Sequence, residues 1–353
     1  MYTIKDYLKF YKDISFEDVS FNEIDNILFS ELSYLTWKGI VNKKKIKLLD
    51  AINLYLDKNV IEINNNFLKG IKENIKIIKN SKRYQDCYLF NFQKEVTDKK
   101  QFGAISILFN RNLYISYEGT DSSISGWKEN FEMCYNFPTK AMIDAINYIN
   151  RVNSNKYKNI YVGGHSKGGN LAVVASMYAK KGIKKKIKFI YNNDGPGLTN
   201  DIFNSKEFKE IESKIKLYIP GDSIVGSLLY QPKITKIVKS NNFSVFEHDC
   251  NSWEVFGTMF VETKPSRGSK ELKTRTINFL EEFDIDKRKE IIETIFLILE
   301  KNNIRYLEDF KKLNLDKLNK ILNNIKNIDD KTKKLILNGI KNLLFSKKNV
   351  KIF

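Results

Sequence analysis

The sequence predicts an α/β fold with a mostly parallel central sheet, helices on both of its faces, an N-terminal helical segment and a helical C-terminal region. Strand-like and helix-like stretches alternate from about residue 101 to residue 240, which is typical of chains that build such sheets. After Pro265 the strand-like stretches stop and helical periodicity continues to about residue 348. The 353 residues are 42% hydrophobic and 29% charged, a composition that supplies a buried core. We therefore expect two regions, residues 1–265 with the sheet and a lysine-rich helical region, residues 266–353.

The N-terminal segment is expected to be helical. Ser20 and Glu23 have the spacing of a capping box and precede apolar residues with a helical period up to residue 35. Residues 46–80 predict further helix with a lysine-rich outer face. Residues 102–109 and 113–117 are then rich in strand formers and flank Asn110-Arg111-Asn112, which predicts a β-hairpin.

The following region carries the alternation. The predicted elements are a helix over 141–152, a strand over 159–163, a helix over 170–180, a strand over 186–192, a helix over 201–213, and strands over 214–219 and 234–238. Beyond residue 270 we expect helices with breaks near Asp284, Asn302 and Asp329-Asp330.

The charge and the cysteines restrict partners and location. The net charge is +18, but only seven of the 60 basic residues are arginine and the excess is spread along the chain, which argues against nucleic-acid binding and allows weak contact with anionic membrane surfaces. Cys87, Cys134 and Cys250 are odd in number and far apart, so they form neither a disulfide framework nor a zinc site. The N-terminus lacks a signal-peptide core, and no apolar run reaches membrane-spanning length. We expect a cytoplasmic protein without a metal site.

The sharpest motif is Gly164-His165-Ser166-Lys167-Gly168, a G-x-S-x-G pentapeptide between a predicted strand and a predicted helix. That context is required of a nucleophile elbow, in which the glycines permit a tight turn and the serine is strained with Oγ exposed. The following helix N-terminus favours developing negative charge. The alternative is a glycine-rich phosphate-binding turn, but no G-x-x-x-x-G-K-[ST] motif is present here. Ser166 is therefore the candidate nucleophile.

A serine nucleophile needs a base, and the chain has only two histidines. His165 adjoins Ser166, so its side chain is expected to point away from Oγ. That leaves His248, which follows the last predicted sheet strand. Its alternative role is that of an ordinary surface-loop histidine.

A carboxylate must orient this base. Asp222 follows the predicted strand 214–219, and the order Ser…Asp…His is the one expected for this architecture. Asp194, at the end of the preceding strand, is the alternative acid or else caps a turn. Asp249 adjoins the histidine and is less able to face its ring. The predicted triad is Ser166, Asp222 and His248.

Four ordered motifs resemble the class 3 lipase-like α/β-hydrolases, most closely a bacterial branch called Mbeg-like. They are Tyr117-Glu-Gly-Thr120, Gly164-His-Ser-Lys-Gly-Gly-Asn170, Asp222-Ser-Ile-Val225 and Glu247-His-Asp-Cys-Asn-Ser-Trp253. The resemblance covers roughly residues 20–265. It implies an α/β-hydrolase fold and a serine hydrolase that cleaves carboxylic esters, lipids among them, without a cofactor.

The resemblance also implies an oxyanion hole. Its donors would be Thr120 and the backbone N–H of Lys167, beside the elbow glycines Gly164 and Gly168; two preorganised donors are what a tetrahedral oxyanion needs. Thr120 could instead be an ordinary turn residue. Two departures argue against a simple triacylglycerol substrate: Lys167 replaces the usual leucine, and Tyr-Glu-Gly-Thr replaces Phe-Arg-Gly-Thr/Ser.

Other interpretations remain open. The chain could be an inactive binding protein that kept the fold, although the intact triad candidates argue against this. The lysine-rich C-terminal helices could dock on membranes or nucleic acid. The apolar segment from Ile124 to Phe137 is either a lid or a core-facing helix, in which Trp127 and Phe131 are i, i+4 partners.

Overall fold

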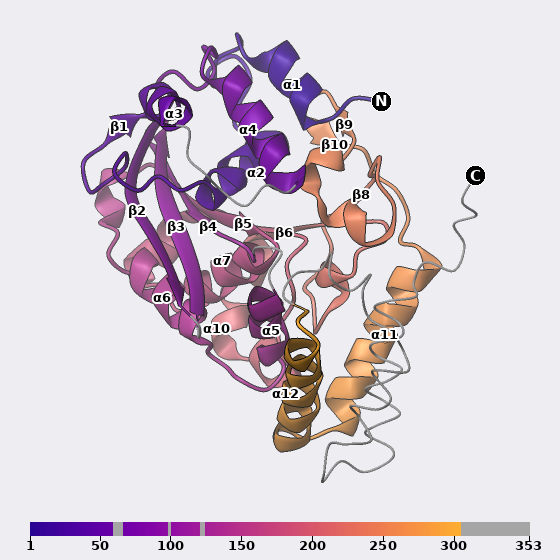
Figure 1. The fold of residues 1–353 in the computed structure, drawn as a ribbon. Coiled ribbons are helices and arrows are strands. Elements are labelled where there is room, and N and C mark those ends of the chain that lie inside the picture. Colours follow the sequence, from indigo (N-terminus) through magenta and orange to yellow (C-terminus); the bar gives the residue numbers. More distant parts are fainter. Residues whose placement is uncertain (59–65, 98–99, 121–123, 305–353) are drawn as a thin grey trace. The chain divides into compact units, whose positions relative to one another are not determined.

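The computed structural model describes residues 1–58, 66–97, 100–120 and 124–304 (Figure 1). Two compact units are present. Of the described residues, the first contains those from 1 to 119 and from 140 to 278, and the second joins residues 120 and 124–139 to residues 279–304. The chain is thus divided by packing at other positions than residue 265, and the predicted domain boundary stays a prediction.

An eight-stranded sheet forms the centre of the first unit, with its strands in chain order (Figure 1). Neighbouring strands are antiparallel from the first strand to the fourth and parallel from the fourth to the eighth. The strands are β1 (Ile46–Lys47), β2 (Tyr88–Thr97), β3 (Lys100–Phe109), β4 (Asn112–Tyr117), β5 (Ile160–His165), β6 (Ile187–Asn193), β7 (Ile215–Pro220) and β8 (Lys236–Val238).

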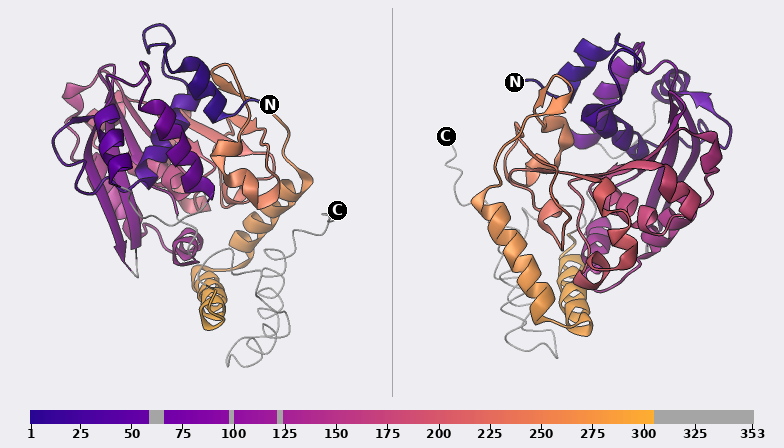
Figure 2. Two further views of the ribbon diagram at one scale, coloured as in Figure 1. Left: turned by 45° about the horizontal axis from the view of Figure 1, so that its top comes forward. Right: turned by 180° about the vertical axis from the view of Figure 1, so that it is seen from behind.

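Helices cover both faces of this sheet (Figure 2). Alternate residues of a strand point to opposite faces, so side chains of β4 contact helices on both sides. Tyr114 Oη lies 2.8 Å from Ser30 Oγ in α2 (Glu23–Glu31), on one face. Tyr117 Oη donates to the carbonyl oxygen of Ala145 in α6 (Lys140–Ile149), on the other face. The α/β-hydrolase fold predicted from the sequence is therefore confirmed. The helices of this unit include α1 (Ile4–Tyr11), α2 (Glu23–Glu31), α3 (Leu48–Asp57), α4 (Asn66–Ile78), α6 (Lys140–Ile149), α7 (Lys167–Met177), α8 (Lys181–Lys186), α9 (Asn200–Phe203) and α10 (Lys206–Lys209).

Several predicted elements need correction. The helix expected from residue 20 begins at Glu23, and its capping box consists of Asn22 and Asp25 rather than Ser20 and Glu23. The helix expected over 46–80 is replaced by β1, α3 and α4, and the helix over 201–213 by two short helices. Strand β2 was not predicted; a bulge at Asn91 interrupts its alternation. The hairpin at residues 110–112 is confirmed, since Asn110 and Arg111 both have positive φ.

A buried ion pair joins the N-terminal segment to the rest of this unit. Arg83 Nη2 lies 2.6 Å and Nε 2.9 Å from the two carboxylate oxygens of Asp25, and both side chains are fully buried. Tyr7 and Tyr84 also donate to Asp25. These charge-assisted bonds satisfy the buried carboxylate, which holds α2 in place.

The second unit pairs α5 (Ile124–Glu132) with α12 (Ile285–Lys301). The rings of Phe131 and Phe296 lie 5.8 Å apart, and those of Trp127 and Phe131 6.4 Å apart. Arg288 donates to the carbonyl oxygen of Cys134. The predicted break at Asp284 is confirmed, since this residue caps α12 and follows α11 (Arg267–Glu282); the break predicted at Asp329-Asp330 lies outside the described residues. None of the helices described is long and apolar enough to span a membrane.

Candidate active site

The strand–turn–helix geometry expected around Ser166 is present. Ser166 separates β5 from α7 with φ 57° and ψ −134°, a conformation that is strained for a residue with a side chain. A Cβ added to Gly168 would lie 2.1 Å from the Tyr117 carbonyl oxygen, and one added to Gly164 would lie 2.4 Å from the Gly168 carbonyl carbon. Only glycine fits at either position. Ser166 itself is 3% exposed, more buried than expected.

His248 is paired with Asp194. Its Nδ1 lies 2.6 Å from Asp194 Oδ2, and Asp194 has no exposed side-chain surface while the His248 side chain is 22% exposed. The other carboxylate oxygen, Oδ1, accepts from Ser223 Oγ at 2.5 Å and from the Gly226 N–H at 3.1 Å. Asp194 is therefore a buried, fully hydrogen-bonded carboxylate aimed at one imidazole nitrogen.

This pairing overturns the prediction that Asp222 orients His248. The Asp222 carboxylate accepts from Ser266 Oγ, and the backbone N–H of Asp222 donates to the Glu247 carboxylate at 2.8 Å. The loop that carries His248, called the histidine loop below, returns over the ends of β5 and β6. Asp194 directly follows β6, whereas Asp222 follows β7, one strand farther away. Asp249, also considered, accepts from Asn251, and burial raises its pKa.

Ser166 and His248 are brought to the same sheet edge through His165. The ring centroids of His165 and His248 lie 4.5 Å apart, and His165 Nε2 lies 2.8 Å from the His248 carbonyl oxygen. Within the described residues no hydrogen bond joins Ser166 Oγ to His248. Such catalytic contacts are often long in unliganded enzymes and tighten when the substrate binds.

The predicted oxyanion-hole residues are only partly placed beside the serine. Gly119 lies against the elbow, since an added Cβ would be 3.0 Å from Ser166 Cβ and 2.4 Å from the His165 carbonyl oxygen. Thr120 belongs to the second unit, where its hydroxyl donates to Asn130 at 3.3 Å. The N–H of Lys167 lies in the first turn of α7, where N–H groups point out of the helix end.

The two departures from the lipase motifs are buried charges. Lys167 is fully buried and its Nζ donates to the Gln101 carbonyl oxygen at 2.8 Å. The Glu118 carboxylate is buried and accepts from Lys94 Nζ at 2.7 Å. Lys167, in the first turn of α7, thus contacts β3, and Glu118 pairs with β2.

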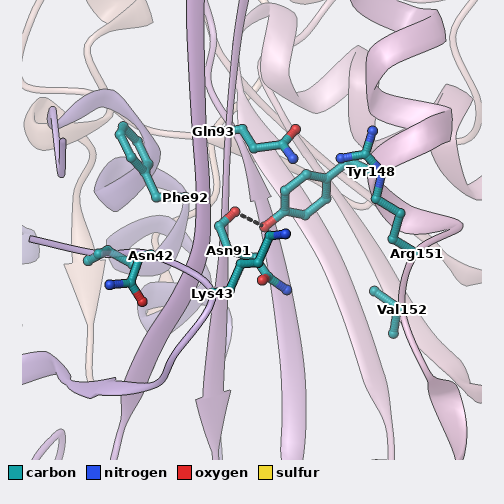
Figure 3. Close-up of a pocket in the computed structure, with 9 residues that line it drawn as sticks. Asn42, Lys43, Asn91, Phe92, Gln93, Tyr148, Arg151 and Val152 are labelled. Atoms are coloured by element: carbon teal, nitrogen blue, oxygen red, sulfur yellow. Dashed lines mark hydrogen bonds between the residues drawn. The ribbon is translucent and has the colours of Figure 1, made fainter. Parts of the chain in front are cut away.

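A separate pocket of about 500 Å³ lies beside strand β2 (Figure 3). It contains none of the residues Ser166, Asp194 or His248. Among the described residues, no cluster of three or more His, Cys, Asp or Glu side chains could hold a metal ion. The pocket is lined by Val41, Asn42, Lys43, Asn91, Phe92, Gln93, Tyr148, Arg151 and Val152.

Comparison with known proteins gives one family and several solved structures. The profile of the Mbeg1-like family matches residues 78–297. Rhizomucor miehei lipase in complex with its propeptide is 16% identical, with 44% of this chain and 57% of that chain covered and a TM-score of 0.31. A lipase from Rhizopus microsporus var. chinensis is 18% identical (57% and 72% covered, TM-score 0.35), and M37 lipase is 16% identical (79% and 81% covered, TM-score 0.38). No curated protein matches the sequence significantly.

Proposed function

Because the chain belongs to the Mbeg1-like family, a lipase-like hydrolase family, we propose that it is a serine hydrolase that cleaves carboxylic esters through Ser166, His248 and Asp194. The observation that carries the proposal is the 2.6 Å contact between His248 Nδ1 and the buried Asp194, beside a strained serine at a strand-to-helix turn. A carboxylate on Nδ1 fixes the proton there and leaves Nε2 of His248 as the base.

The reaction proceeds in two halves. Ser166 Oγ forms a bond to the acyl carbon while its proton passes to His248 Nε2. The imidazolium, stabilised by Asp194, returns that proton to the leaving alkoxide as the ester C–O bond breaks, and an acyl-enzyme remains. Water then attacks the acyl carbon, giving its proton to His248. The carboxylic acid leaves, and Ser166 Oγ regains a proton.

The negative charge of each tetrahedral intermediate needs donors from two loops. We assign them to the Lys167 N–H and to Thr120. The support for this assignment is that Gly119, the residue before Thr120, lies against Ser166. The dipole of α7 adds a favourable potential at the same place.

Labelling with a fluorophosphonate and hydrolysis of a panel of p-nitrophenyl esters of increasing chain length test the proposal. We expect label on Ser166 of the wild-type protein, and Ser166→Ala should lower kcat by at least about 10⁴-fold. Thermal unfolding should be little changed, because one hydroxyl is removed from a small side chain. A folded Ser166→Ala protein with wild-type turnover would refute the mechanism. A wild-type protein that is neither labelled nor active on any ester would favour the inactive binding protein.

A further inference from the structure

The histidine outside the proposed triad, His165, also makes specific contacts. His165 is buried, and both of its ring nitrogens are engaged: Nε2 lies 2.8 Å from the His248 carbonyl oxygen and Nδ1 lies 3.1 Å from Tyr34 Oη. A carbonyl oxygen only accepts, so Nε2 must carry a proton; in the neutral ring Nδ1 is then an acceptor, and it faces the single hydroxyl hydrogen of the tyrosine together with the His165 carbonyl oxygen. The ring is therefore held in one neutral tautomer. Burial supports this state, since it lowers the pKa of His165 well below its usual value, and the nearby His248 lowers it further.

Tyr34 connects this ring to two other parts of the site. Its hydroxyl lies 3.2 Å from the His165 carbonyl oxygen, and the backbone of Gly119 hydrogen-bonds to it. The fit is tight, because a Cβ on Gly119 would lie 2.0 Å from the Tyr34 hydroxyl. The Tyr34 hydroxyl therefore contacts both the end of β5, at His165, and Gly119, the residue before Thr120.

The rest of the histidine loop is anchored on both sides of His248. Before it, the Glu247 carbonyl oxygen accepts from Trp253 Nε1 at 2.8 Å. After it, Cys250 Sγ donates to the buried Glu31, and Asn74 donates to Asn251 Oδ1 at 2.8 Å. At His248 itself the contact comes from His165, so the place of the base along the loop depends on that hydrogen bond.

We propose that His165 is a positioning residue for the base. With Tyr34 as its partner, it holds the backbone of His248 so that the imidazole, fixed on its other side by Asp194, presents Nε2 to Ser166. This inference rests on the proposed function. It assigns no proton transfer to His165, because the nitrogen that bears its proton faces a carbonyl oxygen.

Two substitutions of similar polarity separate positioning from packing. In His165→Gln the side-chain amide nitrogen extends to about the place of Nε2 and can still donate to the His248 carbonyl oxygen. In His165→Asn the shorter amide reaches the Tyr34 side alone. Misplacing a reacting group by about 1 Å costs about 10²-fold in rate. We therefore expect His165→Asn to lower kcat by about 10²-fold with KM little changed. The kcat of His165→Gln should be at least about tenfold higher than that of His165→Asn.

A spectroscopic signature reports on the base directly. The proton between His248 Nδ1 and Asp194 should give a downfield imidazole resonance in the wild-type protein, shifted or broadened in His165→Asn and restored in His165→Gln. A third variant, Tyr34→Phe, removes the hydroxyl that faces His165 Nδ1 and hydrogen-bonds to the Gly119 backbone, without changing either histidine. It should lower kcat at least about 3- to 10-fold, which is the range expected when a single hydrogen bond is lost.

The outcomes are distinguishable. If the wild-type protein is neither labelled by fluorophosphonate nor active, the proposed function has failed. If the wild type is labelled but folded His165→Asn and His165→Gln show equal kcat and an unchanged resonance, the positioning role is wrong and the triad stands. If the histidine variants do not fold, wild-type kcat in a folded Tyr34→Phe protein would overturn the proposal, and the expected loss would support it.

Discussion

Replacing Asp194 by asparagine should cost far more activity than the same change at Asp222. Asparagine must place its carbonyl oxygen on one side and its NH2 on the other. In the structure Asp194 Oδ1 accepts from the Gly226 N–H, which can only donate, and from Ser223 Oγ. The NH2 group would meet a second donor there, so the carbonyl oxygen should take that side. The NH2 group then faces His248 Nδ1.

This arrangement reverses the tautomer of the base. With a donor facing it, Nδ1 of His248 must accept, and the ring proton moves to Nε2, which can no longer take a proton from Ser166. The corresponding change in a serine protease lowers kcat by about 10⁴-fold. We expect a loss of about 10³- to 10⁴-fold in Asp194→Asn, which corresponds to about 4–5.5 kcal/mol of transition-state stabilisation.

Asp222→Asn is the matched control. The Asp222 carboxylate accepts from Ser266 Oγ, which an amide oxygen can still do, and its contact with Glu247 uses the backbone N–H. We expect kcat within about threefold of wild type and a loss of about 1 kcal/mol in unfolding free energy. Steady-state hydrolysis of a short-chain ester and urea unfolding measure both quantities. Near-wild-type turnover in Asp194→Asn, with a collapse in Asp222→Asn, would refute the geometry argued here.

Three further predictions concern stability. Burial raises the pKa of Glu31 to about 8, so this group stays protonated in the folded state over a range where it ionises in the unfolded one. Its contribution to stability should therefore fall as pH rises from about 4.5 to about 8, by at most about 1.4 kcal/mol per pH unit; urea unfolding should show this slope in the difference between wild type and Glu31→Gln, and a pH-independent difference would contradict it. Gly168→Ala should yield little folded protein, because its Cβ would lie 2.1 Å from a backbone oxygen of β4, whereas Gly182→Ala in α8 meets its nearest atom at 3.6 Å and should gain up to about 1 kcal/mol; equal melting temperatures would contradict this. Arg83→Met strands the buried Asp25 carboxylate and should cost about 3–5 kcal/mol; a loss below about 1 kcal/mol in urea unfolding would show that Asp25 is satisfied without it.

Local signals explain what the sequence predicts well. The elbow is recognisable because its steric requirements fall on five consecutive residues, Gly164 to Gly168. A Cβ added to either of the two glycines would lie within 2.5 Å of a backbone atom. The ends of the parallel strands β5, β6 and β7 are predicted to within one or two residues, because these strands are buried on both faces and form apolar runs in the sequence. Each of these elements carries its own evidence.

The choice of the acid has no such local signal. Asp194 and Asp222 both follow a parallel strand, and both precede His248 in the chain. Which of them meets the imidazole depends on the strand end over which the histidine loop returns, and that path is set by contacts such as Asn74 with Asn251 and Cys250 with Glu31. Those contacts span 177 and 219 residues of sequence, beyond the range of any periodicity argument.

The N-terminal segment therefore supplies contacts to the candidate site. The family match begins at residue 78, yet the hydroxyl that holds His165 belongs to Tyr34, and the carboxyl group that holds Cys250 belongs to Glu31. Glu31 is the last residue of α2, and Tyr34 ends the 3₁₀ turn that directly follows it. Helix α2 is itself tied to the rest of the first unit through the buried pair of Asp25 and Arg83. A strand-and-elbow scaffold can present Ser166 by itself. The position of the base, however, depends on residues that the elbow motif does not include, and for that reason the motif alone identifies a nucleophile without identifying the catalytic geometry around it.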